Sequence, residues 1–68
     1  MPRFFVPSTG FDGENVTVLG DDAFHMARSL RMAVGDTVTV CDMHGQEHLC
    51  RLESLRDDVC HLTILSSK

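Results

Sequence analysis

Short strand-like segments make up most of the chain. In several of them polar and apolar residues alternate, which is the pattern of a half-buried β-strand. We predict strands at residues 3–6, 15–19, 37–41, 46–55 and 59–65. The clearest inward-facing positions are Val16, Val18, Val38 and Val40. Leu55 falls out of phase with its segment, which indicates a β-bulge near Ser54.

One segment has the period of a helix. From Asp21 to Leu30, apolar residues recur every three or four positions and would form one face. That face is made by Ala23, Met26, Ala27 and Leu30. The outward side carries His25, Arg28 and Ser29. Gly20 or Asp21 is expected to cap this helix, because small and short polar residues satisfy the free N–H groups of a first turn.

Turn residues separate these elements. Gly35 and Gly45 stand where a backbone with positive φ is expected, and residues 56–58 would close a second tight hairpin. About five to six strands at this size cannot form an open sheet without exposing long edges. We therefore predict a mainly β fold, a small closed or partly closed barrel with one short helix, Asp21 to Leu30, at one end.

The length and net charge of the chain limit the range of possible functions. A chain of 68 residues has room for one domain, and its 43% hydrophobic and 24% charged residues are typical of a globular protein. Ten acidic residues outweigh six basic ones, giving a net charge of -4. The electrostatic field of a protein with this net charge repels a phosphate backbone. Any nucleic-acid binding therefore has to come from a local cluster of basic residues.

The cysteines and the first residues bear on the cellular compartment. Cys41, Cys50 and Cys60 are odd in number and lie in predicted strands, so they are expected to be reduced core residues. The apolar run between Arg3 and Pro7 is far too short for a signal peptide or a membrane span. We expect a cytoplasmic protein that does not contact a membrane.

Two kinds of chemistry find weak support. His25 with Asp21, or His44 with Asp42, could pair for catalysis, but no motif that would activate a nucleophile accompanies them. A zinc site is the second possibility, because four potential ligands surround one hairpin. These ligands are Cys41, His44, His48 and Cys50. The simpler interpretation is a hairpin with core cysteines and two solvated histidines.

A local basic site is the third possibility. Arg3, Arg28 and Arg31 are half of the basic residues, and aromatic or imidazole rings accompany them in the sequence. These rings belong to Phe4, Phe5, Phe24 and His25. Guanidinium groups bind phosphate and stack on bases, which suits single-stranded or looped RNA. The alternative is that the arginines offset the helix dipole or pair with nearby aspartates, and that Phe24 only covers the rim of the core.

Several motifs together resemble a known family. These motifs are Pro2-Arg-Phe-Phe-Val6, Gly20-Asp-Asp-Ala23, His25-x-x-Arg28-x-Leu-Arg-Met32-x-x-Gly35-Asp36, and Cys41-Asp42 followed by Gly45. They are similar to the N-terminal part of the bacterial 16S ribosomal RNA uracil-N3 methyltransferases. Phe24 and Met43-His44 depart from the family pattern.

The resemblance implies a division of labour. In that family this segment is a PUA-like β-barrel that helps to hold ribosomal RNA, and a SPOUT domain that follows it binds S-adenosylmethionine and transfers the methyl group. Residues 1–68 would then be a single PUA-like domain without the SPOUT domain. It would hold no cofactor and no catalytic or metal-binding residue, although its parent would be an enzyme.

The resemblance also names site residues and partners. It supports Arg3, His25, Arg28 and Arg31 as RNA-binding residues, and the local basic site adds Phe5 as a possible stacking ring. The partner would be 16S rRNA or the small ribosomal subunit, and we expect a homodimeric parent but a monomeric fragment. The alternatives are a structural or protein-interaction barrel that supports a dimer and, with less support, a small zinc-binding hairpin domain.

Overall fold

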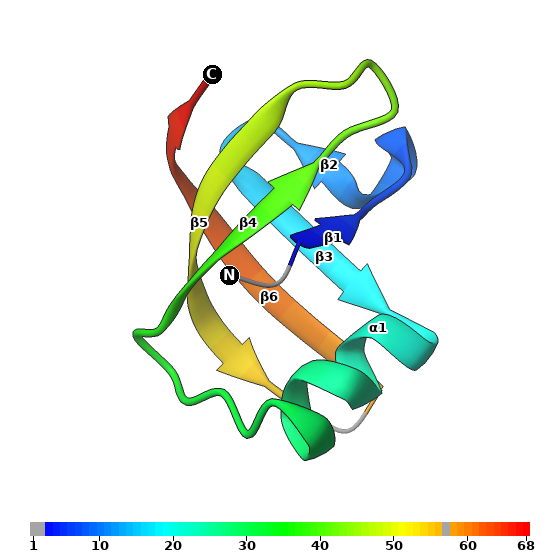
Figure 1. Ribbon diagram of the computed structural model, residues 1–68, viewed down its shortest axis with the longest axis vertical. Helices are drawn as coiled ribbons and strands as arrows, with labels where there is room; N and C mark the ends of the chain where they lie inside the picture. Colours follow the sequence, from blue (N-terminus) through cyan, green and yellow to red (C-terminus); the bar gives the residue numbers. More distant parts are fainter. Residues whose placement is uncertain (1–2, 57) are drawn as a thin grey trace.

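The computed structural model describes residues 3–56 and 58–68, and its described part is a small, strongly curved β-sheet with a short helical segment at one end (Figure 1). The six strands are β1 (Arg3–Phe5), β2 (Phe11–Asp12), β3 (Asn15–Leu19), β4 (Thr37–Cys41), β5 (Glu47–Leu55) and β6 (Val59–Ser67). The predicted mainly β class with one short helix is confirmed. The tight turn predicted at residues 56–58 includes Asp57, which lies outside the described residues.

The strand order makes a half-barrel. It runs β1-β4-β5-β6-β3-β2, with β1 parallel to β4 and every other pair antiparallel. Because β1 and β2 are the two edges, the barrel is partly closed, and the short turn η1 (Ser8–Gly10) lies in the stretch between those two strands. Register shifts in the β5–β6 pair, one of them between Leu52 and Ser54, confirm the predicted bulge.

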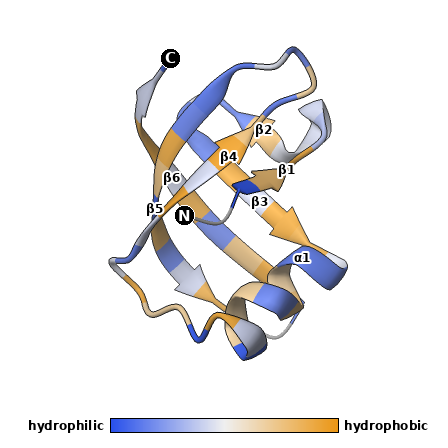
Figure 2. Cartoon of the chain, viewed as in Figure 1, coloured by the Kyte–Doolittle hydropathy of each residue, from blue (hydrophilic) through white to orange (hydrophobic). Residues whose placement is uncertain are grey.

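The core fills the concave side of this sheet. Along the strands, hydrophilic and hydrophobic residues follow one another in bands (Figure 2). The inward residues predicted from this alternation are buried, and the core cluster also takes in Phe4, Val6, Leu62 and Met26. Burying such side chains is the main stabilising contribution in a domain of this size. The three cysteines are free and buried, as predicted.

The helical segment differs from the predicted regular helix. It begins as α1 (Gly20–Phe24) and continues as the π-helix η2 (His25–Ser29), in which the Leu30 N–H donates to the His25 carbonyl at 3.0 Å. Ala23 and Met26 are fully buried as expected, but Leu30 is 36% exposed. The wider turn changes the rotation per residue, so the last position of the predicted apolar face leaves the core.

The start of this segment also differs from the prediction. The N-cap position is Leu19, and no side chain caps the first turn. Instead, the Gly20 N–H donates to the Asp58 carbonyl at 3.1 Å, so the β5–β6 connection satisfies it. Gly20 itself has a φ of +67°, which only glycine adopts readily. None of the helices in the described residues is long and apolar enough to cross a membrane.

Candidate nucleic-acid interface

Strand β1 and the helical segment are separated in the sequence by β2 and β3, but they contact each other at one side of the half-barrel. Phe4 points into the core and is 5% exposed, and its ring centroid lies 6.0 Å from that of His25. His25 itself is exposed. This contact brings two parts of the predicted site together, the Arg3-Phe-Phe segment and the outward side of the helical segment.

The neighbours of Phe4 point outward, because side chains alternate along a strand. Phe5 is 70% exposed, an unusual state for a phenylalanine in a small domain. The Arg3 guanidinium lies 3.3 Å from the Glu47 carboxylate on β5. Arg3 thus belongs to the outer face of the sheet, where an RNA phosphate would compete with a surface ion pair of small net value.

Arg28 lies against an aromatic ring. Its guanidinium carbon is 5.6 Å from the centroid of Phe24, a cation–π geometry, and the Phe24 side chain is 52% exposed. Phe24 therefore does more than cover the core rim, since it holds the guanidinium in place. Guanidinium groups that stack on aromatic rings also bind planar acceptors such as phosphate.

Arg31 ends the helical segment in a strained conformation. Its φ of +51° is the left-handed region, which glycine usually provides after a helix. The Met32 N–H donates to the Met26 carbonyl at 3.0 Å and closes the turn around it. A non-glycine residue here costs roughly 1–2 kcal/mol, and such strain is concentrated at functional sites. The turn aims an exposed arginine outward beside the π-helix.

A pocket opens beside Phe5. It has a volume of about 330 Å³ and lies where β1, η1, the end of β3 and the start of α1 meet. Its lining is mostly apolar, and Asp22 contributes one carboxylate. We call this cavity the seam pocket. Its lining residues are Phe5, Val6, Pro7, Thr9, Gly10, Thr17, Val18, Leu19 and Asp22.

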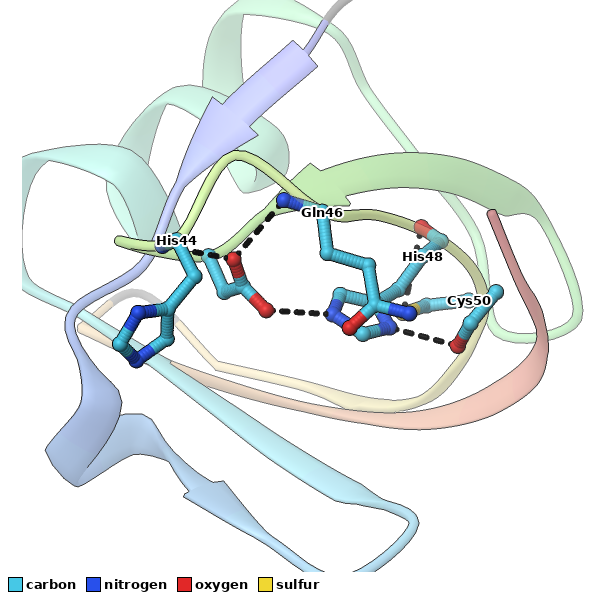
Figure 3. Close-up of polar contacts among 6 residues, drawn as sticks. His44, Gln46, His48 and Cys50 are labelled. Atoms are coloured by element: carbon cyan, nitrogen blue, oxygen red, sulfur yellow. Dashed lines mark hydrogen bonds and ion pairs between the residues drawn. The ribbon is translucent and has the colours of Figure 1, made fainter.

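A second polar cluster occupies the opposite end of the barrel, at the β4–β5 turn (Figure 1). The His48 ring is only 7% exposed, and Figure 3 shows a contact on each side of it. Its Nε2 donates to Asp42 Oδ2 at 3.0 Å, and its Nδ1 shares a hydrogen bond with the Ser67 hydroxyl at 2.7 Å. Asp42 also accepts the backbone N–H groups of His44 and Gln46, at 2.8 and 3.0 Å.

This arrangement fixes the turn. The hydrogen bond from His48, followed by those from the backbone, holds the pKa of Asp42 below its ordinary value of 3.8. The Phe11 ring covers the histidine, with 5.3 Å between ring centroids. The cluster connects the β4–β5 turn, strand β5 and the end of β6. Its contacts therefore stabilise the fold.

The zinc and catalytic interpretations of this hairpin find no support in its geometry. Cys50 is fully buried in the core, and burial raises the pKa of its thiol to about 11. His44 points away from His48 (Figure 3). Within residues 3–56 and 58–68, no three His, Cys, Asp or Glu side chains come together as metal ligands. A thiol with so high a pKa is a poor nucleophile at neutral pH.

The buried role of His48 escaped the sequence analysis, which expected a solvated histidine. The signal was present, because His48 has the same parity as Cys50 and Leu52 on one strand and therefore faces the same side. The presence of Asp42 at the first position of the turn would have supplied its partner. The seam pocket was missed too, since it joins segments that no local pattern connects.

Comparison with known proteins identifies a family of RNA methyltransferase domains. The sequence profile of a family described as "RNA methyltransferase PUA domain" matches residues 18–65. A search of curated proteins gave no match. Among solved structures, the chain superimposes on a ribosomal RNA small subunit methyltransferase E from Neisseria gonorrhoeae bound to S-adenosyl methionine. The TM-score is 0.74 at 29% identity, and the match covers 100% of this chain and 28% of that one.

Two further structures show the same fold at lower identity. A predicted RNA methyltransferase from Thermotoga maritima gives a TM-score of 0.84 at 24% identity, over 97% of this chain and 29% of that one. A probable rRNA-methyltransferase from Porphyromonas gingivalis gives 0.81 at 24% identity, over 100% of this chain and 27% of that one. The chain thus spans less than a third of the length of each of these proteins.

Proposed function

Because the chain belongs to the RNA methyltransferase PUA domain family, we propose that it is the RNA-binding accessory domain of an enzyme that N3-methylates a uridine of 16S rRNA. The observation that carries this proposal is the family match over residues 18–65, which include the helical segment, β4, β5 and most of β6. The domain positions ribosomal RNA, and the methyl transfer itself belongs to the rest of the parent protein.

The proposed contacts follow from the surface at β1 and the helical segment. Arg28, held by Phe24, and Arg31, at the strained turn, bind phosphates, and Arg3 does so by exchanging its Glu47 partner. Phe5 stacks on a base, because its ring is exposed. His25 donates a hydrogen bond to RNA from the rim of the Phe4 contact.

S-adenosylmethionine fits the rest of the parent better than this chain. At about 330 Å³ the seam pocket is at the small end for ligand sites and contributes one carboxylate, which suits a single base better than a whole cofactor. We assign the cofactor, which supplies the methyl group, to a SPOUT domain outside residues 1–68. The parent is proposed to be a cytoplasmic homodimer and the present chain a monomer.

A salt titration tests RNA binding directly. The chain is titrated with a small-subunit rRNA hairpin at several salt concentrations, and affinity should fall with a log–log slope of about -0.7 per phosphate contact in a single-stranded loop. Changing both Arg28 and Arg31 to Ala should weaken binding and reduce that slope by about 1.4, the value for two lost contacts.

The matched control is the double change Arg51→Ala and Arg56→Ala. It removes the same charge from exposed positions outside the proposed interface. If both double variants weaken binding equally, the interface is wrong and only net charge matters. If the unchanged chain binds no rRNA hairpin, the RNA-binding function itself is wrong.

A protein-interaction module is the second candidate function, and one observation favours it. Several large apolar side chains are more than half exposed, among them Leu19, Val34 and Met43 at 67%, 65% and 67%. Sedimentation of the chain at high concentration separates the two candidates. Self-association without RNA binding would favour the interaction module.

A further inference from the structure

The seam pocket lies where the barrel fails to close. Strand β3 pairs with β6 along its whole length, but on its other side β2 covers only Asn15 and Val16. Thr17, Val18 and Leu19 therefore present a strand edge that no described strand covers, and all three line the pocket. The opposite wall is built by Phe5 and the segment that follows it. The pocket thus follows from the strand order of the fold.

The pocket combines an exposed aromatic wall with an anionic end. Phe5 is 70% exposed and Leu19 67%, so both leave apolar surface at the mouth. Val6 and Val18, each nearly fully buried, form the floor. Among the described residues of the lining, Asp22, in the first turn of α1, is the only charged one. A flat apolar ring with hydrogen-bond donors along one edge would match this arrangement.

We propose that the seam pocket is a subsite for a single unpaired guanine base of the bound RNA. This inference rests on the proposed RNA-binding function and adds to it the identity of one base. The base stacks against Phe5 and turns its Watson–Crick edge toward Asp22. Unpaired RNA bases are commonly bound in this way, with stacking on an aromatic ring and hydrogen bonds to the exposed edge.

The carboxylate selects the base. An ionised carboxylate only accepts hydrogen bonds, and its two oxygens can accept two parallel donors. Guanine offers that pair, the N1–H and the N2 amino group. Adenine and cytosine each place one donor beside an acceptor, and uracil flanks its single N3–H with two carbonyl oxygens. Asp22 therefore binds guanine and repels the acceptor edge of the other bases, including the uridine that the parent is proposed to methylate.

The test is an NMR titration of the isotope-labelled chain with short RNAs. Five-nucleotide oligouridines carry guanine, inosine, adenine, cytosine or uracil at the central position. We expect the guanine oligonucleotide to bind about 5- to 10-fold more tightly than the adenine, cytosine and uracil ones. Inosine, which lacks the N2 amino group, should be intermediate. The largest shifts are expected at the backbone amides of Phe5, Leu19 and Asp22.

Two isosteric variants isolate the carboxylate. Asp22→Asn should reduce the guanine preference to less than about 2-fold, because one of the two acceptors becomes a donor. Asp21→Asn is the matched control, since it removes the same charge from the neighbouring exposed residue, which does not line the pocket. It should keep the full preference. Phe5→Leu should weaken binding of every oligonucleotide by a similar factor.

The outcomes separate this inference from the function on which it rests. Equal binding of all five oligonucleotides, together with salt-dependent binding of the rRNA hairpin, would overturn the guanine subsite and leave the RNA-binding domain. Binding of none of the RNAs would overturn both. A guanidinium offers a similar pair of donors, so a short arginine peptide is the remaining probe. If it shifts the same amides and binds more tightly than the guanine oligonucleotide, the pocket is a peptide site and the inference is wrong.

Discussion

At the scale of single residues, Arg31 combines a backbone cost with an exposed cation. Its φ of +51° is a conformation that a glycine would hold without strain. An arginine at this position does not stabilise the fold. Its contribution is to binding, through the guanidinium. The contribution of Arg31 to stability and its contribution to RNA binding should therefore have opposite signs.

Two substitutions separate these contributions. Arg31→Gly should be about 1 kcal/mol more stable than Arg31→Ala, because only glycine relieves the strain, while both lose RNA affinity to the same extent. Urea unfolding gives the free energies, and the rRNA titration gives the affinities. An alanine variant as stable as the glycine variant would show that the left-handed turn is not strained.

Asp42 is the second residue with a measurable consequence. Its pKa is lowered from 3.8, chiefly by the hydrogen bond from His48, so the native protein stabilises the charged form. This stabilisation is complete above the pKa of the unfolded chain, near 4, and is lost as the pH falls through the lowered native value. The cluster should therefore weaken in acid.

Asp42→Asn tests this dependence. The free energy of unfolding of the unchanged chain should fall more steeply below about pH 4 than that of the variant. Urea unfolding from pH 7 to pH 3 measures both curves, and Glu14→Gln, which removes a charge from an exposed residue, controls for net charge. Parallel curves for the unchanged chain and Asp42→Asn would contradict the role of the cluster.

At the scale of elements, η1 lies close against β3 because Gly10 has no side chain. A Cβ on Gly10 would lie 2.5 Å from Val6 Cγ1 and 2.8 Å from the Thr17 carbonyl oxygen. Neither the buried valine nor the strand backbone can move away easily. This close approach sets one wall of the seam pocket.

Gly10→Ala should therefore destabilise the chain. We expect a loss of about 1–3 kcal/mol, the usual cost of overpacking a tight site. Thermal unfolding measures it, and Ser8→Ala, at an exposed position of the same turn, is the control. If the two variants melt at the same temperature, η1 is free to move away from β3 and the wall is not rigid.

The elements also show where sequence patterns were sufficient. Strands β3 and β4 were predicted with the observed bounds, because strict alternation needs only local information. The helical segment was predicted in place, but its π-turn was not, and Leu30 was assigned to the core for that reason. Whether the wider turn forms depends on how the segment packs against the sheet. The local spacing of apolar residues gives no information on that packing.

At the scale of the whole molecule, the fold class and the family were predictable from the sequence, and the pocket was not. The motifs around Arg3, His25 and Arg31 indicated the family, which the family match confirms. The seam pocket depends on Phe5 lying beside Asp22 and Leu19, a proximity set by the order of the sheet. That order pairs β1 with β4, far along the chain, and alternation within a strand carries no information on such partners.

The open seam has a mechanical consequence. Among the described strands, β1 pairs only with β4, so across the pocket it faces the end of β3 without strand pairing. A base that fills this space contacts both walls. It therefore links two strand edges that are unpaired when the pocket is empty. Occupancy should therefore slow hydrogen exchange in β1, so that the RNA itself completes the closure of the barrel.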